Sequence, residues 1–330
     1  MRFILGVVRL LAGLLIVVTA APAILAILGF AVPALDLLNH LQLLLFFGTL
    51  VALVVGAIVR TWRWAIVLAS LGFVASAWTF VPEWLSSLPT RPVANGQVLK
   101  LMTHNIFGLN YDMKRVAAAI ARENPDIVAL QEYFPEQQAL DALLKSAYPY
   151  SVRCQGGKRA NLGLYSKIPF DREMSAADCP EAAGKQRTAH IIAGFTLSDG
   201  THFSVMTTHM DWPFPIERQQ QEFAVAEDAA RTVDGPLLVV GDFNSTPWSY
   251  AMKGFEAATG LKRETRNLIT FPELFTVPQR ISRDGIVRTI PFLPLDQVFE
   301  RGIVVTELHR GEPTGSDHLP VIFSFTVPKS

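Results

Sequence analysis

The chain has 330 residues, of which 50% are hydrophobic, and its 29 Lys and Arg residues balance its 29 Asp and Glu residues. This length gives room for one large domain and an additional segment. Residues 1–96 contain few charges and more basic than acidic ones, so the remainder of the chain carries a small acidic excess. That charge balance gives no basic footprint of the kind expected for tight nucleic-acid binding.

Three long apolar segments lie in the first quarter of the chain, at 10–32, 37–59 and 64–81, and they contain no Asp, Glu, Lys or Arg. A helix needs about 20 mostly apolar residues to cross the core of a bilayer, and these lengths fit. We therefore expect residues 1–81 to form a membrane region of three transmembrane helices. A secretory signal is an alternative for the first segment. Three buried core helices are disfavoured because such helices rarely stay apolar on every face.

Basic residues predict how this region is oriented. Arg2 and Arg9 precede the first segment, Arg60 and Arg63 lie between the second and the third, and the first loop, near 33–36, has no Lys or Arg. Short cytoplasmic loops carry an excess of Lys and Arg. The N-terminus and the second loop are therefore expected to be cytoplasmic. The chain is expected to be a multi-pass integral membrane protein with its remaining residues on the extracytoplasmic side.

Residues 82–96 are rich in Pro and Ser and have the composition of a linker. A catalytic domain is expected to follow at 97–330. Cys154 and Cys179 both lie in this domain. An exported domain can join them in a disulfide, whereas two unpaired buried thiols also fit the sequence.

The hydrophobic pattern of residues 97–330 predicts alternating strands and helices, with no internal repeat. A helix should follow Asp112 as its N-cap and stop at Asn124-Pro125. Further helices are expected at 135–145 and 216–230. Strands are expected at 98–103, 127–130, 150–153, 162–166, 188–197, 202–208, 237–240, 296–299, 304–308 and 321–325. Strands that alternate with helices early and then run together predict stacked sheets with helices outside, an α+β fold.

Three oxygen-bearing side chains lie where predicted strands end. Glu132 and Asp317 are acidic residues at such positions, and Asn105 offers an amide oxygen. Hard cations such as Mg²⁺ take oxygen ligands and keep several waters, so one or two carboxylates suffice. Each residue taken singly also fits a solvated acid or a turn cap. In combination they predict a divalent-metal site.

Asp242 and Asn244 follow the buried run at 237–240, with only Gly241 between the run and Asp242. Alternate residues of a strand point to one face, so both side chains can enter the same cleft. Asp242 would orient or deprotonate an attacking water, and Asn244 would donate a hydrogen bond to a phosphate oxygen. The alternative is an Asx-turn after a strand.

Two histidines, His209 and His318, adjoin predicted strands. An imidazolium can donate to phosphate oxygens as charge develops, and an imidazole can take a proton from water. Asp296 is placed to accept a hydrogen bond from His318 and raise its pKa. The other histidines receive no catalytic role; they are His40, His104, His190, His202 and His309.

Other hydrolytic chemistries lack their motifs. The sequence contains no Gly-x-Ser-x-Gly, no phosphate-binding glycine loop with Lys-Ser/Thr and no His-Glu-x-x-His. The two cysteines lack the spacing of a zinc site.

Seven segments in order carry a family resemblance. They are His104-Asn105, Gln131-Glu132, the segment 161–167, Thr208-His209, the segment 241–244, the segment 295–299 and Ser316-Asp317-His318. Over about 98–325, this order resembles the endonuclease/exonuclease/phosphatase superfamily, whose fold resembles deoxyribonuclease I. The resemblance implies a four-layer αββα sandwich, two packed mixed sheets flanked by helices, with the site at one edge of the sheets.

The resemblance also implies roles and a cofactor. Glu132 would bind the metal, with Asn105 and Asp317 close by, and Mg²⁺ is the expected ion, with Mn²⁺ able to substitute. The expected catalytic residues are His209, Asp242, Asn244, Asp296 and His318. Arg187 is a further candidate for a phosphate contact. Nuclease members often carry a Tyr or Glu just ahead of the strand at 162–166, where this chain has Arg159-Ala160-Asn161, so His209 lacks an obvious acidic partner.

The sequence therefore predicts a membrane-anchored, metal-dependent phosphoester hydrolase. The apolar loop at 212–215 (Trp-Pro-Phe-Pro) favours a lipid headgroup or a small phosphodiester as substrate. An extracytoplasmic nuclease acting on nucleic acid is the first alternative, and a catalytically inactive binding module of the same fold is the second. No protein partner is predicted.

Overall fold

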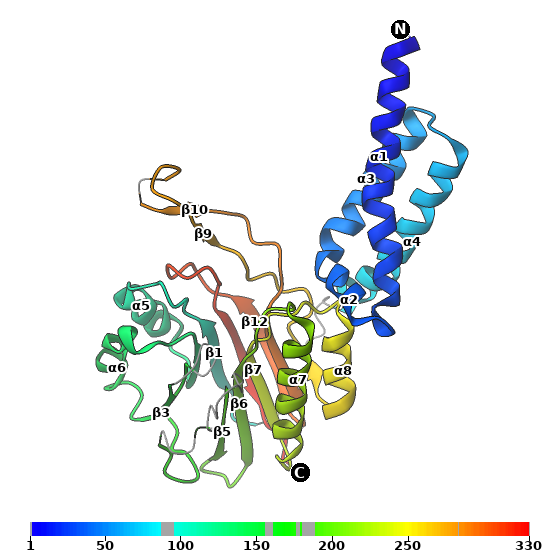
Figure 1. The fold of residues 1–330 in the computed structure, drawn as a ribbon. Helices are drawn as coiled ribbons and strands as arrows, with labels where there is room; N and C mark the ends of the chain where they lie inside the picture. The colour runs from blue at the N-terminus through cyan, green and yellow to red at the C-terminus, as the bar shows by residue number, and fades with distance from the viewer. Residues whose placement is uncertain are drawn as a thin grey trace. The chain divides into compact units, whose positions relative to one another are not determined.

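The computed structural model describes residues 2–86, 96–155, 161–175, 179, 189–282 and 284–329 (Figure 1). The chain divides into two compact units. The first consists of Met1–Pro89 and Thr246–Gly254, and the second of Thr90–Ser245 and Phe255–Ser330. The assignment of Thr246–Gly254 to the N-terminal unit was not expected from the sequence.

The N-terminal unit is helical. Its elements are α1 (Arg2–Ala26), η1 (Ile27–Phe30), α2 (Pro33–Asp36), η2 (Leu37–Leu41), α3 (Gln42–Ile58) and α4 (Arg63–Ser86). Three stretches are long and apolar enough to cross a membrane: Phe3–Phe30, Pro33–Ile58 and Arg63–Ser86. Small residues allow the helices to approach closely, since a Cβ on Gly72 would lie 2.6 Å from the Cα of Ala20.

The first turn between these helices is structured by side-chain hydrogen bonds. Ser76 donates to Gln42 (2.8 Å), Gln42 donates to Asn39 (2.8 Å), and Asn39 donates to Asp36 (2.8 Å). All four residues are buried, and a buried polar group costs free energy unless it is paired. The segment near 33–36, expected to be a loop, is therefore helical and tied to α3 and α4. At the other end of the unit, α4 continues through Pro82 to Ser86, so the first residues of the expected linker are helical.

The second unit contains two mixed sheets. One has the order β12-β13-β1-β2-β4-β3 and the other β5-β6-β7-β11-β8. The strands of the first sheet are β1 (Leu99–Asn105), β2 (Ile127–Gln131), β3 (Tyr150–Cys154), β4 (Leu162–Ser166), β12 (Val304–Arg310) and β13 (Val321–Thr326). Those of the second are β5 (Ala189–Thr196), β6 (His202–His209), β7 (Leu237–Asp242), β8 (Lys262–Arg263) and β11 (Asp296–Arg301).

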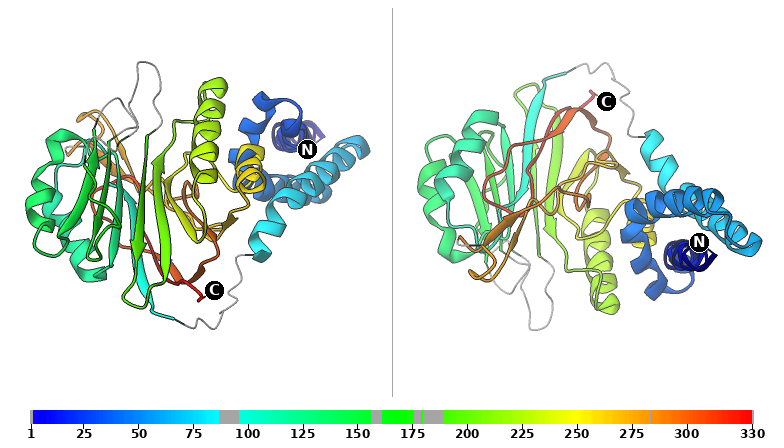
Figure 2. Two further views of the ribbon diagram at one scale, coloured as in Figure 1. Left: turned by 90° about the horizontal axis from the view of Figure 1, so that it is seen from below. Right: turned by 90° about the horizontal axis from the view of Figure 1, so that it is seen from above.

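The sheets pack face to face, and helices cover their outer faces (Figures 1 and 2). Apolar side chains from both sheets form the central core, including Leu101, Ile127, Val205, Val240 and Phe323. The helices α5 (Met113–Glu123) and α6 (Ala139–Leu144) contribute Val116, Ile120 and Leu140 to a second core over β1 and β2. On the other side, α7 (Ile216–Arg231) and α8 (Tyr250–Thr259) contribute Phe223 and Phe255, which pack against Phe243 and Phe299. The four-layer αββα sandwich is confirmed.

Local signals account for most of the boundaries. Asp112 caps α5 by accepting the amide of Arg115, and the helix ends at Asn124 in the left-handed conformation. The helix expected at 135–145 is instead a 3₁₀ turn, η3 (Pro135–Gln137), followed by α6. The side chain of Gln137 donates to the carbonyls of Phe107 and Asn110, which ties this turn to the preceding loop.

Three further features complete the unit. Cys154 and Cys179 form a disulfide, so the paired alternative is the one the structure adopts. The strands β9 (Leu274–Thr276) and β10 (Ile286–Arg288) form a separate antiparallel hairpin. Neither this hairpin nor α8 was expected from the sequence, because both are short and lack a clear hydrophobic period.

Candidate active site

Strand register brings the expected site residues to one edge of the two sheets. In the first sheet, β1 and β2 are parallel, and Asn105 pairs with Gln131, the residue before Glu132. In the second, β6 and β7 are parallel and pair His209 with Asp242, while antiparallel β11 places Asp296 opposite Asp242. The ends of four strands and the beginning of a fifth therefore carry polar side chains to the same place.

Unusual backbone conformations shape this edge. Gly241 has φ +143°, and a Cβ on it would lie 2.0 Å from the carbonyl oxygen of Thr208 in the neighbouring strand. Only glycine fits this position without displacement. Glu132 and Asn244 also have positive φ, 55° and 45°, which is uncommon for residues with a side chain. The chain thus turns sharply after β2 and after β7. Glu132 and Asn244 lie in these turns rather than continuing the extended strands.

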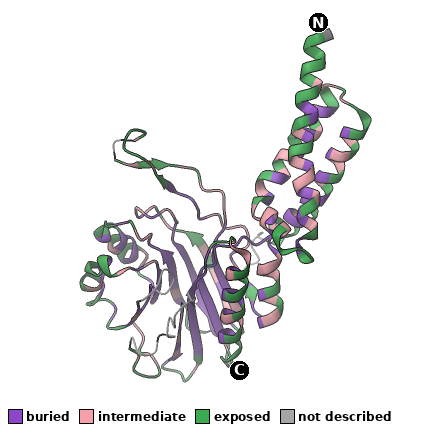
Figure 3. Cartoon of the chain, in the orientation of Figure 1, coloured by how far each residue is buried: buried purple, intermediate pink, exposed green. Residues whose placement is uncertain are grey.

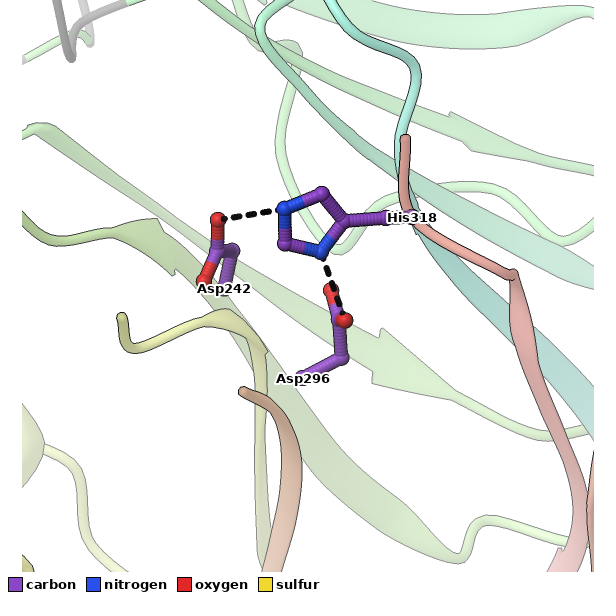
Figure 4. A group of neighbouring side chains, drawn as sticks. All are labelled: Asp242, Asp296 and His318. Carbon is purple, nitrogen blue, oxygen red and sulfur yellow. Dashed lines mark hydrogen bonds and ion pairs between the residues drawn. The ribbon is translucent and has the colours of Figure 1, made fainter. Parts of the chain in front are cut away.

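A buried group of three side chains lies at the centre of the site (Figure 4). The Nδ1 atom of His318 lies 2.8 Å from Oδ2 of Asp296, and its Nε2 atom lies 3.5 Å from Oδ2 of Asp242. Asp242 and Asp296 are almost fully buried. His318 therefore has a carboxylate at each ring nitrogen.

The electrostatics of this group favour a charged imidazole. Burial lowers the pKa of His318, but the negative charges of Asp296 and Asp242 outweigh it and raise this pKa to about 10. Burial raises the pKa of Asp242 to about 7, with a contribution from Asp296, while the charge of His318 and a hydrogen bond from Asn105 oppose the rise. Near neutral pH, His318 is protonated and Asp242 can exchange a proton.

Hydrogen bonds fix the orientation of Asp242. Its Oδ2 atom accepts from Nδ2 of Asn105 (2.9 Å), and its Oδ1 atom accepts the amide of Asn244 (2.8 Å). The side-chain amide of Asn244 donates to the carbonyl of Met210 (2.9 Å) and also lies 3.3 Å from Asp242. The side-chain donors of Asn244 are therefore engaged within the protein, and its backbone amide helps to orient Asp242. Its role as a phosphate donor stays a prediction.

The histidine at the end of β6 has the acidic partners that its sequence neighbours did not supply. Nε2 of His209 lies 3.5 Å from Asp242 and 3.8 Å from Glu132. These carboxylates come from β7 and from the end of β2, far from His209 in sequence. Nuclease members of the family often carry a Tyr or Glu near the position of residues 159–161. In this chain Glu132 and Asp242, which are distant in sequence, lie near His209 instead.

The negative charges of Glu132 and Asp317 repel each other. Burial raises the pKa of Asp317 to about 6, the charge of His318 opposes this, and the negative charge of Glu132 raises it further. Oε2 of Glu132 accepts the amide of Gly108 at 2.8 Å. Ser316 holds the loop that carries Asp317 by donating to the carbonyl of Asn105 at 2.7 Å. The three expected metal-site residues thus converge at the ends of β1 and β2.

The donor set at this point fits a hard divalent cation. Glu132 and Asp317 offer carboxylate oxygens whose mutual repulsion a cation would relieve. The amide oxygen of Asn105 accepts the amide of Phe107 at 3.0 Å, and an amide oxygen has a second lone pair. Asp242, Asp296 and His318 also offer three ligand atoms within 4.8 Å of one another. In that group, however, Nδ1 of His318 and Oδ2 of Asp296 already bond to each other, so an ion would have to use Nε2 of His318 and Oδ1 of Asp296.

Several supporting residues carry no sequence signal. Arg153 pairs with Asp141 (2.7 Å) and donates to the carbonyls of Tyr133 and Phe134, directly after Glu132. Tyr133 donates to the same carboxylate of Asp141 (2.9 Å). This network stabilises the turn that holds Glu132 in its left-handed conformation. No motif marks it, because its members are scattered over three elements.

His104, which was given no catalytic role, has a structural one. His104 is fully buried, and its Nε2 atom lies 2.7 Å from the hydroxyl of Thr314. Burial lowers the pKa of His104 to about 3, against the opposing effect of Asp296, so it stays neutral and serves the structure. Arg187 lies outside the described residues.

Comparisons with known proteins agree with this fold. The sequence matches the endonuclease/exonuclease/phosphatase family over residues 102–318. It is 31% identical over 238 residues to a UPF0294 protein of Vibrio campbellii, covering 69% of this chain and 78% of that protein.

Solved structures share the fold. TDP2 from C. elegans superposes with a TM-score of 0.53 at 19% identity, covering 83% of this chain and 89% of the other. An endonuclease/exonuclease/phosphatase from Beutenbergia cavernae superposes with a TM-score of 0.51 at 20% identity, covering 70% and 72%. Together with the match over residues 102–318, which includes most of the second unit, these findings show that the chain belongs to the endonuclease/exonuclease/phosphatase family.

Proposed function

We propose that this protein is a membrane-anchored, divalent-metal-dependent phosphoester hydrolase. Membership of a family of phosphoester hydrolases supports the reaction class. The observation that carries the proposal is the buried His318, held between Asp296 and Asp242 beside the Glu132 and Asp317 pair. That arrangement combines a proton acceptor, a cationic hydrogen-bond donor and a place for a hard cation.

The proposed reaction is an in-line attack of water on phosphorus. Asp242 takes a proton from the water as the oxygen–phosphorus bond forms, and the bond to the leaving oxygen breaks on the opposite side. His318, charged by Asp296 and Asp242, donates to a non-bridging phosphate oxygen as negative charge develops. His209 supplies a second donor from β6. Asn105 and Asn244 hold the Asp242 carboxylate in position.

The proposed metal role is electrostatic. Glu132 and Asp317 would hold Mg²⁺ or Mn²⁺, with Asn105 as an additional oxygen donor, and the ion would neutralise charge on the phosphate. The residues of the chain provide the remaining steps: binding, orientation of water and proton transfer.

The proposed location is a membrane, with residues 97–330 forming the catalytic domain on its extracytoplasmic side. Three stretches of the N-terminal unit are long and apolar enough to span a bilayer. The disulfide between Cys154 and Cys179 supports an oxidising compartment. A lipid headgroup or a small phosphodiester is the proposed substrate, because Trp212 and Phe214 expose 43% and 71% of their surface just after His209.

A panel of phosphoesters tests this function. The purified full-length protein is given phospholipid vesicles, bis(p-nitrophenyl) phosphate, DNA and RNA, with Mg²⁺ or Mn²⁺ and with EDTA. We expect metal-dependent, EDTA-sensitive cleavage, faster on phospholipid or the small diester than on nucleic acid. DNA cleavage far above lipid cleavage would favour a nuclease, and the absence of cleavage together with no effect of metal on melting would indicate an inactive binding module.

A further inference from the structure

The β9–β10 hairpin exposes apolar side chains that no part of the described chain covers. Phe275, Ile281 and Ile290 expose 47%, 63% and 89% of their surface, and Ile286 and Val287 are also exposed. The hairpin extends away from the two sheets (Figure 1, orange), and its surface is mostly exposed (Figure 3). Clusters of exposed apolar side chains in a soluble unit mark interaction sites.

Both faces of this ribbon are exposed. In its antiparallel register, Phe275 pairs with Val287 on one face and Thr276 pairs with Ile286 on the other. A ribbon that packs on its own domain buries one face and exposes polar residues on the other. Here exposed apolar residues lie on both faces, a pattern that does not fit a ribbon packed on its own domain.

Basic side chains accompany the apolar ones. Arg280 lies next to Ile281 at the turn and is exposed. Arg288 follows Val287 and forms an ion pair with Glu273 at the base of the ribbon. Apolar side chains that insert between acyl chains, bordered by Arg or Lys at the level of the headgroups, are typical of segments that bind a membrane interface.

The base of the hairpin is joined to the active site. The ring of Phe271 lies 4.7 Å from the ring of His318, and the amide of Glu273 donates to the carbonyl of Asp317 at 2.7 Å. Trp212 also packs against Phe271, with ring centroids 5.6 Å apart. A surface bound by the hairpin would therefore lie next to the catalytic residues.

We propose that the β9–β10 hairpin, residues 274–290, binds a phospholipid bilayer by inserting Phe275, Ile281 and Ile286 into its interface. The proposal rests on the membrane anchoring proposed above and deepens it, since it makes headgroups of the bilayer the substrates at the site. A bilayer is the binding partner we choose for the hairpin, because the proposed transmembrane helices anchor the same chain in one. Only residues 87–98 separate α4 from β1, a length that reaches at most about 45 Å.

Depth-dependent quenching tests the contact. The full chain carrying Ile281→Cys is labelled with bimane without reduction, since Cys154 and Cys179 are paired, and is reconstituted into phosphatidylcholine–phosphatidylglycerol liposomes. Ser198→Cys, in the exposed turn that precedes β6 at the end away from His209, is the matched control. Doxyl-labelled lipid should quench the label at 281 at least about twofold and leave the label at 198 unchanged. Equal quenching at both positions would overturn the proposal.

A second copy of the chain is the competing occupant. Liposomes that contain a mixture of donor- and acceptor-labelled Ile281→Cys proteins, without doxyl lipid, reveal it by energy transfer. Transfer that falls as the protein is diluted in lipid, combined with no doxyl quenching, would assign the hairpin to self-association and overturn the bilayer contact. Doxyl quenching that persists at high dilution supports it.

Rates of cleavage on vesicle phospholipid and on a soluble diester distinguish a failure of the hairpin contact from a failure of the proposed hydrolase. Phe275→Ser and Ile281→Ser should lower cleavage of vesicle phospholipid by about tenfold and leave cleavage of soluble bis(p-nitrophenyl) phosphate unchanged. If the wild type cleaves neither substrate, the proposed hydrolase fails, while the quenching still decides the contact. If both variants cleave vesicle lipid at the wild-type rate and the label at 281 is not quenched, the hairpin inference fails and the hydrolase stands.

Discussion

Replacing Asp296 by Asn removes a charge from the catalytic group while keeping its shape. The Nδ1 atom of His318 lies 2.8 Å from Asp296, and an Asn oxygen can still accept that hydrogen bond. Raising the pKa of His318 from its ordinary value to about 10 corresponds to roughly 5 kcal/mol of preference for imidazolium. Asp296 contributes more to this rise than Asp242, so Asp296→Asn should lower the pKa of His318.

The expected kinetic result follows from the loss of that charge. If charged His318 stabilises the transition state, kcat should fall by roughly a hundredfold at pH values above the lowered pKa, as it does when one well-placed donor is removed. The pH–rate profile should also change. His318 must be protonated to act, so the alkaline limb of the profile, expected near 10 in the wild type, should move to lower pH in Asp296→Asn.

The assay is metal-dependent hydrolysis of bis(p-nitrophenyl) phosphate measured across this pH range. Asp171→Asn is the matched control, because Asp171 also pairs with a histidine, His202 (3.0 Å), at the other end of β6. Its rate should stay within about twofold of the wild type, as expected for a surface substitution. Unchanged kcat and an unchanged alkaline limb in Asp296→Asn would refute the role of charged His318.

Three further predictions concern the backbone, the support of Glu132 and the metal. Gly241→Ala should lower the free energy of unfolding by about 3 kcal/mol in chemical denaturation, because its Cβ would meet the carbonyl of Thr208, whereas Gly254→Ala, which meets no neighbour, should be neutral or stabilising. Asp141→Asn should weaken Mn²⁺ binding by about tenfold in calorimetry, since it removes the partner of Arg153; unchanged affinity would count against this network. Mg²⁺ should raise Tm less near pH 5 than near pH 8, because burial raises the pKa of Asp317 to about 6 and protons then compete with the ion; an equal rise at both would exclude Asp317 as a ligand.

Much of the fold could be predicted because its core strands are long and apolar. The strands β1, β2, β6 and β7 and the helices α5 and α7 follow clear hydrophobic periods, and Asp112 caps α5. Stacked sheets with helices outside follow from this order, whereas the four-layer arrangement and the site at one edge of the sheets were implied by the family resemblance. The helix α8 could not be predicted because it is short and contains Gly254. The hairpin β9–β10 has strands of three residues, too short for periodicity to reveal.

The sequence could predict which residues belong to the site better than which of them contact one another. Sequence order placed His318 beside Asp296, as the structure shows. It could not place Glu132 beside His209, because that contact joins the ends of strands in different sheets. It also could not place Asp242 beside His209, because that contact depends on the register between β6 and β7. It also could not show that the amide of Asn244 is engaged by Met210. Such pairings depend on backbone turns whose geometry is set by the whole fold.

The location of the bound ion tests the account most directly. Crystals of the protein soaked in Mn²⁺ would reveal the ion by its anomalous scattering. The account predicts one strong peak between the carboxylates of Glu132 and Asp317, lost in Glu132→Gln, with the bond between His318 and Asp296 intact. A peak among Asp242, Asp296 and His318 instead, or no peak in the wild type, would contradict it.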